Sequence, residues 1–249
     1  MEEMIYSFSR LTTFRQCNYS FYLNYIEEAP QENNSWGVGG GHSHDVLEAY
    51  YKGEIPLEGI ADYWLFTAPQ LSFPTMKPNY LSKYVEDCYN FFKALEQGIW
   101  SLENEVIGVE REFIVDIEGK KLKGFIDLET RSENGKIQIL DWKTSGMSSF
   151  TGKKLAEKAR QLFLYAISQK EKWGQYPDEI QFVMMRYGKT IKIPFTMERM
   201  EEAKRWMLET VDMIEKAETY YRNEDFFFCK NICGHTTCDL NGRHPNNLK

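Results

Sequence analysis

The stretch "IQILDWKTS" (137–145) ends an apolar run with an acid and a base two positions apart. Side chains alternate along a β-strand with a period of two, so Asp141 and Lys143 should point to the same side of this strand. Taken alone, the pair also fits a solvated strand end that carries a weak ion pair. The other side chains that reach the same face decide between these two interpretations.

A turn upstream predicts which residue lies opposite Asp141. Asn134 and Gly135 stand between two apolar runs, a pattern typical of a β-hairpin. If the loop has three residues, is centred on Asn134 and places Gly135 in the left-handed conformation, Asp127 lies opposite Asp141. Cross-strand partners share a face, with side chains about 5 Å apart. The sequence therefore predicts two neighbouring carboxylates.

A second turn adds a third acid to this face. A hairpin that turns near Gly119 brings Glu110 or Glu112 beside Asp127, and the spacing leaves both open. Carboxylates held this close repel one another unless a cation neutralises them. Oxygen-rich sites suit Mg²⁺ or Mn²⁺, and Lys143 beside the ion could polarise a water or stabilise charge at a phosphate. We therefore interpret the face as a divalent-metal site.

The cysteines predict a second site. Cys88 lies on the apolar stripe of a predicted helix and fits a core position. The tail "CKNICGHTTC" packs Cys229, Cys233 and Cys238 into ten residues. In a reducing compartment such a group binds metal rather than forming disulfides. Because only three cysteines are local, a site with four thiolates must recruit a distant ligand.

The elements that position these residues can be predicted from periodicity. We expect helices over 7–28 (with Ser9 as a possible cap), 80–98, 153–172 and 197–222. Strand patterns predict three antiparallel strands within 106–145 and a hairpin over 179–195. The stretch "WGVGGG" (36–41) predicts a break before a helix that begins at His42. The fold class is therefore α/β, with a mixed central β-sheet flanked by helices.

Composition excludes some classes of protein. A chain of 249 residues with 42% hydrophobic content fits one large domain or a domain with an elaborated subdomain. No run of about 18 apolar residues predicts a membrane span. The start has neither a basic n-region nor an apolar h-region, so we expect an intracellular, cytoplasmic protein, whether encoded by a cell or a phage.

Charge argues against nonspecific binding to polyanions. The net charge is −7, from 30 basic and 37 acidic side chains. Bound cations or local basic patches could still supply phosphate contacts. One such patch contains Lys153, Lys154, Lys158 and Arg160, and it also fits a solvated helix face.

Three motifs together resemble a known family. "GFIDLE" followed by "ILDWKTS" resembles the PD-(D/E)XK nuclease motif in its RecB-like form, in which an acid on one strand precedes a D/E-x-K on the hairpin partner. "GGGHSHDVLE" resembles the family's G-x-x-x-H helix motif at Gly40 and His44. "QLFLYAI" resembles its Q-x-x-x-Y motif, which places Gln161 and Tyr165 on one helix face.

The resemblance implies roles for individual residues. It implies a divalent metal held by His44, Asp127, Asp141 and the backbone carbonyl of Trp142, with Lys143 placing the water. It also implies that Gln161 and Tyr165 line the active-site groove. Because "VEREFIV" resembles the family's E-x-F-x-V strand, Glu112 is the preferred nearby acid, with Glu110 left open.

A further resemblance concerns the cysteines. "SFSRLTTFRQCNYSFYLNYI" resembles the N-terminal iron–sulfur segment of RecB-like nucleases of the AddB and CRISPR-associated kinds, in which one early cysteine joins three late ones. It implies that Cys17 joins Cys229, Cys233 and Cys238 around a [4Fe–4S] cluster. The family tail is commonly C-x2-C-x5-C, whereas this one is C-x3-C-x4-C with His235 inside it. A Cys₃His zinc site therefore stays open.

The resemblance also implies a domain plan. Residues 1–249 would form a single RecB-like nuclease domain. Within it we expect a helical subdomain over 42–105, a catalytic sheet core over 106–195, and a metal-cluster clasp formed by 1–28 plus 223–249.

The function implied is that of a metal-dependent DNA nuclease. We expect an exonuclease that acts on DNA ends or single strands in recombination, repair or CRISPR-type processing, with DNA and a helicase, recombination or CRISPR protein as partners. The sequence has no G-x-x-x-x-G-K-[ST], so no ATPase motor is evident. Two alternatives stay open, a noncatalytic nucleic-acid-binding module of a larger complex and a structure-specific endonuclease.

Overall fold

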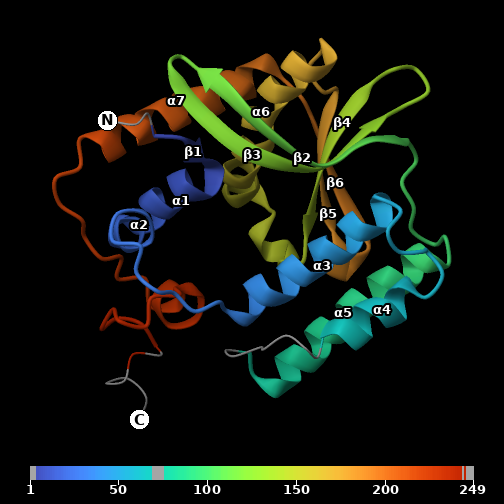
Figure 1. Ribbon diagram of the computed structural model, residues 1–249, viewed down its shortest axis with the longest axis horizontal. Helices are drawn as coiled ribbons and strands as arrows, with labels where there is room; N and C mark the ends of the chain where they lie inside the picture. The colour runs from blue at the N-terminus through green and yellow to red at the C-terminus, as the bar shows by residue number, and fades with distance from the viewer. Residues whose placement is uncertain (1–3, 69–75, 243, 245–249) are drawn as a thin grey trace.

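A mixed β-sheet forms the centre of the protein, with helices on both of its faces. The computed structural model describes residues 4–68, 76–242 and 244, arranged as in Figure 1. The sheet has six strands, in the order β1-β3-β4-β5-β6 with β2 paired to β3. They are β1 (Tyr6–Ser7), β2 (Glu105–Ile117), β3 (Lys120–Arg131), β4 (Ile137–Lys143), β5 (Glu179–Met184) and β6 (Lys189–Pro194). This architecture confirms the predicted fold class.

The helices divide into two layers. They are α1 (Phe8–Gln16), α2 (Asn18–Tyr25), α3 (Ser35–Tyr51), α4 (Ile60–Thr67), α5 (Pro78–Glu96), α6 (Gly152–Trp173) and α7 (Met197–Glu215), with short turns η2 (Met147–Ser149), η3 (Met185–Tyr187) and η4 (Phe228–Ile232). One buried cluster joins α1, α6 and α7 to the sheet and includes Ile139 of β4. The other joins α3, α4 and α5 to the sheet and includes Leu140 and Trp142. Alternate side chains of β4 thus pack into one cluster or the other.

The two hairpins predicted within 106–145 form as expected. Gly135 has a φ of 80°, and the last pair before its loop is Arg131 with Ile137. Leu128 pairs with Leu140, which is the register that places Asp127 opposite Asp141 one step further on. Gly119 has a φ of 81° in the turn between β2 and β3. The register predicted from the turns is therefore confirmed.

The glycine-rich stretch is a helix rather than the predicted break. Helix α3 begins at Ser35, and the side chain of Asn34 caps it by accepting a hydrogen bond from the Gly37 N–H at 2.9 Å. A Cβ on Gly39 would lie 2.6 Å from the ring of Tyr84 on α5. Gly39 thus allows close packing between α3 and α5, and this tertiary contact outweighs its preference for a turn.

Three other helix boundaries differ from the predictions. The segment predicted as one helix over 7–28 forms α1 and α2, which are separated at Cys17, where φ is −158°. The N-cap of α1 is Ser7 rather than Ser9, because the Ser7 hydroxyl accepts from the Arg10 N–H at 3.1 Å. Helix α7 ends at Glu215 instead of 222. Helix α4 and the two-residue strand β1 were not predicted, since both are short.

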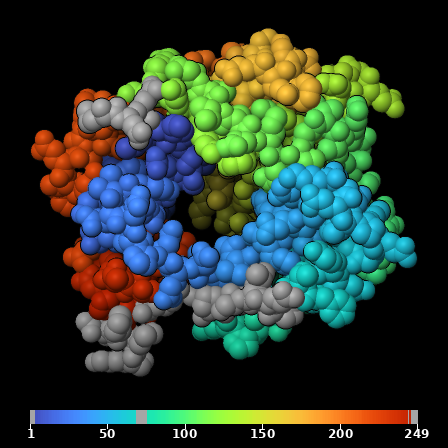
Figure 2. Space-filling view, in the orientation of Figure 1, coloured from blue at the N-terminus to red at the C-terminus, as the bar shows by residue number. Residues whose placement is uncertain are grey.

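A hollow opens on one face of the molecule. Figure 2 shows it between α1 and α2 on one side, α3 on the other, and the β2–β3 hairpin above. The segment around η2 and the start of α6 forms its floor. The linker between α2 and α3 closes the lower rim. We call this feature the hollow below.

Candidate functional site

Asp127 and Asp141 lie side by side where β3 and β4 part. Pairing between these strands ends at Leu128 and Leu140, and further along β3 its pairing partner is β1, at Leu122 and Lys123. Strand β2 covers the other edge of β3 throughout. The two acids therefore stand in a fork between β4 and β1, where a strand edge is open to other groups.

His44 reaches this fork from α3. Its Nδ1 lies 3.4 Å from Asp127 Oδ2, and its Nε2 lies 2.8 Å from the backbone carbonyl oxygen of Trp142. Gly40, one turn earlier, faces the end of β4, because a Cβ there would lie 3.2 Å from Thr144 Oγ1. The absence of a side chain at Gly40 lets α3 approach β4 closely enough for His44 to contact both partners.

The third acid of the site is Glu110 rather than Glu112. One ligand atom from each of His44, Glu110 and Asp127 lies within 4.8 Å of the others. Glu110 falls between the pairs Val109–Leu128 and Arg111–Ile126, and is therefore opposite Asp127.

Glu112 lies further along β2. It pairs with Phe125, and its exposed side chain makes an ion pair with Lys123. The spacing could not separate the two acids, because residues 110 and 112 have the same parity on the strand.

The carboxylates are crowded and poorly solvated. Burial raises the pKa of Glu110 to about 7, and the Asp127 carboxylate adds to this effect. Burial also raises the pKa of Asp127 to about 6, again with help from a neighbouring carboxylate, that of Asp141. Such a group is costly when fully ionised unless a cation is bound. One imidazole and several carboxylate oxygens converge here, and this donor set fits Mg²⁺ or Mn²⁺.

Lys143 is held against Asp141. Its ammonium lies 2.5 Å from Asp141 Oδ2, and the Asp141 side chain is only 4% exposed. Although burial lowers the pKa of Lys143, the carboxylates of Asp141 and Asp127 together raise it above its usual value. Lys143 therefore remains a cation in the fork.

Gln161 and Tyr165 face the carboxylates from α6. Gln161 Nε2 donates to the Tyr165 hydroxyl at 3.2 Å. Burial raises the pKa of Tyr165 to about 12, with smaller contributions from the site carboxylates, which places its hydroxyl in their field. The Tyr165 ring packs edge-on against Phe113, with centroids 4.8 Å apart. The structure thus brings together every predicted residue of this site except Glu112.

One further cation belongs to this region. Lys158 lies one turn before Gln161 on α6, and its ammonium sits 5.1 Å from the centroid of the Phe150 ring. Burial and then the positive charge of Lys143 lower the pKa of Lys158. The signal in the sequence was its spacing of three residues from Gln161. By contrast, the Lys153 side chain is 90% exposed and pairs with Glu157.

The four cysteines outside the core lie near one another. Cys17 Sγ accepts from the Asn223 N–H at 3.3 Å, and Cys229 Sγ donates to the Asn223 carbonyl at 3.1 Å. Burial raises the pKa of Cys229, and the Cys233, Cys17 and Cys238 thiols raise it further. Cys88, by contrast, is fully buried in the cluster of α3, α4 and α5.

His235 is buried beside these cysteines, and burial lowers its pKa. Thiolates around one zinc ion, at about 2.3 Å from it, lie within about 4 Å of one another. In the part of the chain that the structure describes, only His44, Glu110 and Asp127 form a triplet of ligand atoms within 4.8 Å. The cysteines and His235 are thus spaced more widely than a single zinc ion requires.

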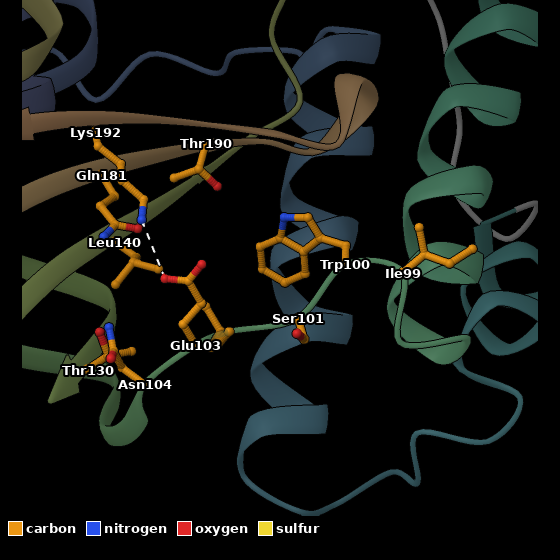
Figure 3. A pocket seen from close by; sticks show the side chains of 11 residues that line it. Ile99, Trp100, Ser101, Glu103, Asn104, Thr130, Leu140, Gln181, Thr190 and Lys192 are labelled. Atoms are coloured by element: carbon orange, nitrogen blue, oxygen red, sulfur yellow. Dashed lines mark ion pairs between the residues drawn. The ribbon is translucent and has the colours of Figure 1, made fainter. Parts of the chain in front are cut away.

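A separate cavity lies away from this site. It has a volume of about 360 Å³ and is lined by residues of segment 99–104 and of the strands, among them Gln181 and Lys192. Figure 3 shows the ion pair between Lys192 and Glu103 across it, at 3.7 Å. None of its lining residues belongs to the fork. The cavity therefore has no part in the chemistry of the carboxylates.

Comparison with known proteins agrees with this geometry. The sequence profile of the PD-(D/E)XK nuclease superfamily matches residues 5–241. The crystal structure of a "putative exonuclease" from Eubacterium rectale superposes with a TM-score of 0.54 at 13% sequence identity, covering 88% of this chain and 84% of that one. No curated protein matches the sequence. Among the residues described, no helix combines the length and apolarity needed to cross a bilayer.

Proposed function

The chain belongs to the PD-(D/E)XK nuclease superfamily, and on that basis we propose that it is a Mg²⁺- or Mn²⁺-dependent deoxyribonuclease of the RecB-like kind. Its reaction would be hydrolysis of phosphodiester bonds at DNA ends or in single strands. The observation that carries the proposal is the convergence of His44, Glu110 and Asp127 within 4.8 Å, beside the ion pair of Asp141 and Lys143.

The residues of the fork divide the chemical work. A bound divalent cation would lower the pKa of a water and neutralise charge at the phosphate. His44, Asp127, Asp141 and the Trp142 carbonyl would hold that cation, with Glu110 at its side. Lys143, kept protonated by two carboxylates, would orient the attacking water and stabilise the charge that develops on the phosphate oxygens.

The residues of α6 would bind the substrate beside the reacting phosphate. Gln161 and Tyr165 form a hydrogen-bonded pair on the face that the carboxylates meet. Lys158 carries a positive charge one turn away and has no carboxylate within ion-pair distance in the described structure. A phosphate of the DNA backbone would supply the missing partner.

The hollow supports a preference for ends or single strands. The floor of the hollow is the segment that follows Lys143, and its walls come from the stretch α1 to α3 with its linker and from the β2–β3 hairpin (Figure 2). An unpaired strand is narrower than a duplex and would enter such a depression more readily. We propose that the chain either works alone or lends nuclease activity to a partner, such as a helicase, recombination or CRISPR protein.

The cysteines support a structural [4Fe–4S] cluster bound by Cys17, Cys229, Cys233 and Cys238. The four thiols influence one another, and their spacing is wider than a zinc site needs. The same region is joined by two hydrogen bonds of Asn223, whose N–H donates to Cys17 Sγ and whose side-chain amide donates to the Gln16 carbonyl. A cluster there would stabilise the fold by restricting the unfolded chain, because the loop it closes is long.

Digestion of labelled DNA tests the proposed function. End-labelled linear and closed circular DNA, each single- and double-stranded, would be incubated with Mg²⁺ or Mn²⁺, with Asp141→Asn as the inactive control. We expect metal-dependent loss of linear single strands and survival of circles. Cleavage of circles would instead identify an endonuclease. DNA binding without any cleavage would identify the noncatalytic alternative.

A further inference from the structure

We propose that the buried ion pair between Arg111 and Glu129 is a clamp that holds Glu110 in a left-handed backbone conformation and so aims its carboxylate at His44 and Asp127. Arg111 and Glu129 would be positioning residues that contact neither metal nor substrate. The inference rests on the metal site of the proposed function, and it adds the device that assembles that site.

The first observation is the backbone at Glu110. Its φ is 44°, a left-handed value that is uncommon and strained for a residue other than glycine. Strained residues of this kind persist only where the surrounding structure determines their conformation, and they concentrate at functional sites. Glu110 is one of the three residues whose ligand atoms converge in the fork.

The second observation explains why this conformation is needed. Val109 packs against the buried cluster of α3, α4 and α5. Arg111, two residues further along β2, points to the opposite face, where it donates to Ser168 Oγ of α6. Side chains two residues apart on a regular strand share one side. The left-handed residue between them breaks this alternation, so that Glu110 meets Asp127 while Arg111 reaches Glu129.

The third observation is the strength of the contact on Glu129. Its carboxylate is fully buried and accepts from Arg111 Nε at 2.6 Å and Nη2 at 2.8 Å. Trp173 Nε1 donates to the same carboxylate at 3.1 Å, and Arg111 Nη2 also donates to Ser168 Oγ at 3.0 Å. The pair is thus anchored to α6 at two points.

Gly108 makes room for this arrangement. It pairs directly with Glu129, and a Cβ at this position would lie 2.5 Å from Glu129 Oε2. A β-bulge between Val106 and Gly108 precedes it. The strand is therefore irregular at this bulge and at Glu110, and the Arg111–Glu129 pair fixes the irregular part to the rest of the fold.

Stability alone does not account for such a pair. A buried ion pair adds little compared with apolar side chains of the same size, because both charges lose their hydration. Replacing both partners by methionine should therefore preserve folding while removing the directional contact. The variant Arg111→Met/Glu129→Met thus separates positioning from stability.

Metal binding without DNA gives the direct readout. Isothermal titration of the apoprotein with Mn²⁺ should show an affinity about tenfold weaker, or more, in Arg111→Met/Glu129→Met than in the wild type. Gly108→Ala keeps both charges but displaces Glu129, and it should weaken Mn²⁺ binding in the same direction. The control is Arg186→Met/Asp87→Met, which removes a pair that is 12% and 11% exposed and joins η3 to α5. Its affinity for Mn²⁺ should equal that of the wild type.

A mutant cycle shows whether the effect passes through Glu110. If it does, Glu110→Ala and the triple variant Glu110→Ala/Arg111→Met/Glu129→Met should bind Mn²⁺ equally weakly, because the ion pair acts only through the Glu110 carboxylate, which both variants lack. Additive losses would overturn the inference, as would unchanged binding in both the methionine pair and Gly108→Ala. Failure of the wild type to bind Mn²⁺ would instead reject the proposed metal site, and the clamp with it.

Discussion

The backbone N–H of Trp142 donates a hydrogen bond of 2.8 Å to Asp127 Oδ2 at the point where β3 and β4 part. A side chain thus continues the link between the two strands where their backbone pairing has ended. This bond fixes one oxygen of Asp127 beside His44, whose Nδ1 lies 3.4 Å from the same atom. The fork is therefore a preorganised site, and substitutions in it should affect chemistry more than folding.

Asp141→Asn should abolish cleavage and leave the protein folded. The substitution removes the negative charge that repels the Asp127 carboxylate. The amide oxygen of the new side chain remains as a neutral hydrogen-bond acceptor for Lys143. The Tm should stay within about 4 °C of the wild type, which corresponds to about 1 kcal/mol for a chain of this length. Digestion of single-stranded DNA and thermal denaturation measure the two effects. Cleavage at the wild-type rate would show that Asp141 is not part of the site.

Glu110→Gln and Glu112→Gln form a matched pair that tests which acid belongs to the site. The two residues are neighbours on one strand, but only Glu110 converges with His44 and Asp127. Glu110→Gln should raise the Mn²⁺ concentration needed for half-maximal cleavage, whereas Glu112→Gln loses only an exposed ion pair with Lys123. The opposite ranking of the two variants would contradict the assignment.

His44→Ala should have an effect of the same kind. The imidazole contacts both Asp127 and the Trp142 carbonyl, so its loss would remove a proposed metal ligand and open the contact between α3 and β4. We expect a higher Mg²⁺ or Mn²⁺ requirement with little change in DNA affinity. Metal titrations of cleavage rate measure it, with His42→Ala as the control, because His42 contacts Trp64 and Thr67 instead. An unchanged metal requirement would reduce His44 to a structural residue.

The stability of the metal-free protein should fall as the pH rises. Folding raises the pKa of Glu110 to about 7 and that of Asp127 to about 6. A carboxyl whose pKa is raised by folding stabilises the fold below its unfolded pKa, near 4, and this contribution is lost as the pH passes the folded pKa. The Tm in EDTA should therefore decrease between about pH 4 and pH 7. Added Mg²⁺ should restore the Tm at pH 7 and above. A Tm in EDTA that does not change with pH would contradict the mutual repulsion of the site carboxylates.

Lys158→Ala should weaken DNA binding, whereas Lys153→Ala should not. Each phosphate contact contributes about 0.7 to the slope of log K against log salt for a single strand. Fluorescence anisotropy with a labelled oligonucleotide in Ca²⁺ should show that slope reduced by about 0.7 in Lys158→Ala alone. Equal slopes in the two variants would assign Lys158 to the solvated face that Lys153 occupies.

Protein purified without oxygen should be brown. Cys17→Ser and Cys233→Ser should each remove the colour and destabilise the fold, whereas Cys88→Ser should keep the colour and cost about 1–3 kcal/mol in the core. Iron and zinc analysis, absorbance and thermal denaturation measure these outcomes. Colourless protein with one zinc, unaffected by Cys17→Ser and damaged by His235→Ala, would replace the cluster with the zinc site.

The register of the sheet could be predicted because local chemistry specified it. Gly135 and Gly119 adopt the left-handed conformations that their turns require, and these turns fix which residues face each other. The choice between Glu110 and Glu112 could not be made in this way. It depends on a left-handed residue that is not glycine, and that conformation is imposed by tertiary contacts of Arg111 and Glu129.

The start of α3 shows the opposite failure. Its glycines carry a strong local signal for a turn, and the helix forms because Asn34 caps it and Tyr84 fills the space that a side chain would occupy. A sequence without its partners does not reveal such a contact. The association of Lys158 with the site could not be predicted for a similar reason. Its spacing from Gln161 points to the site only when the position of α6 relative to the fork is known.

The rim of the hollow joins two segments that are far apart in the sequence and are therefore synthesised at different times. Asn34 donates to the Ile232 carbonyl at 3.1 Å, across 198 positions in sequence, and the Glu32 N–H donates to the Gly234 carbonyl at 2.9 Å. During synthesis the linker between α2 and α3 must wait for this partner until nearly the whole fold has been translated. Ribosome-bound chains that stop before residue 232 would contain the complete carboxylate fork but an open rim. The proposed metal site would thus be complete before the rim of the hollow, which we propose selects the substrate, is closed.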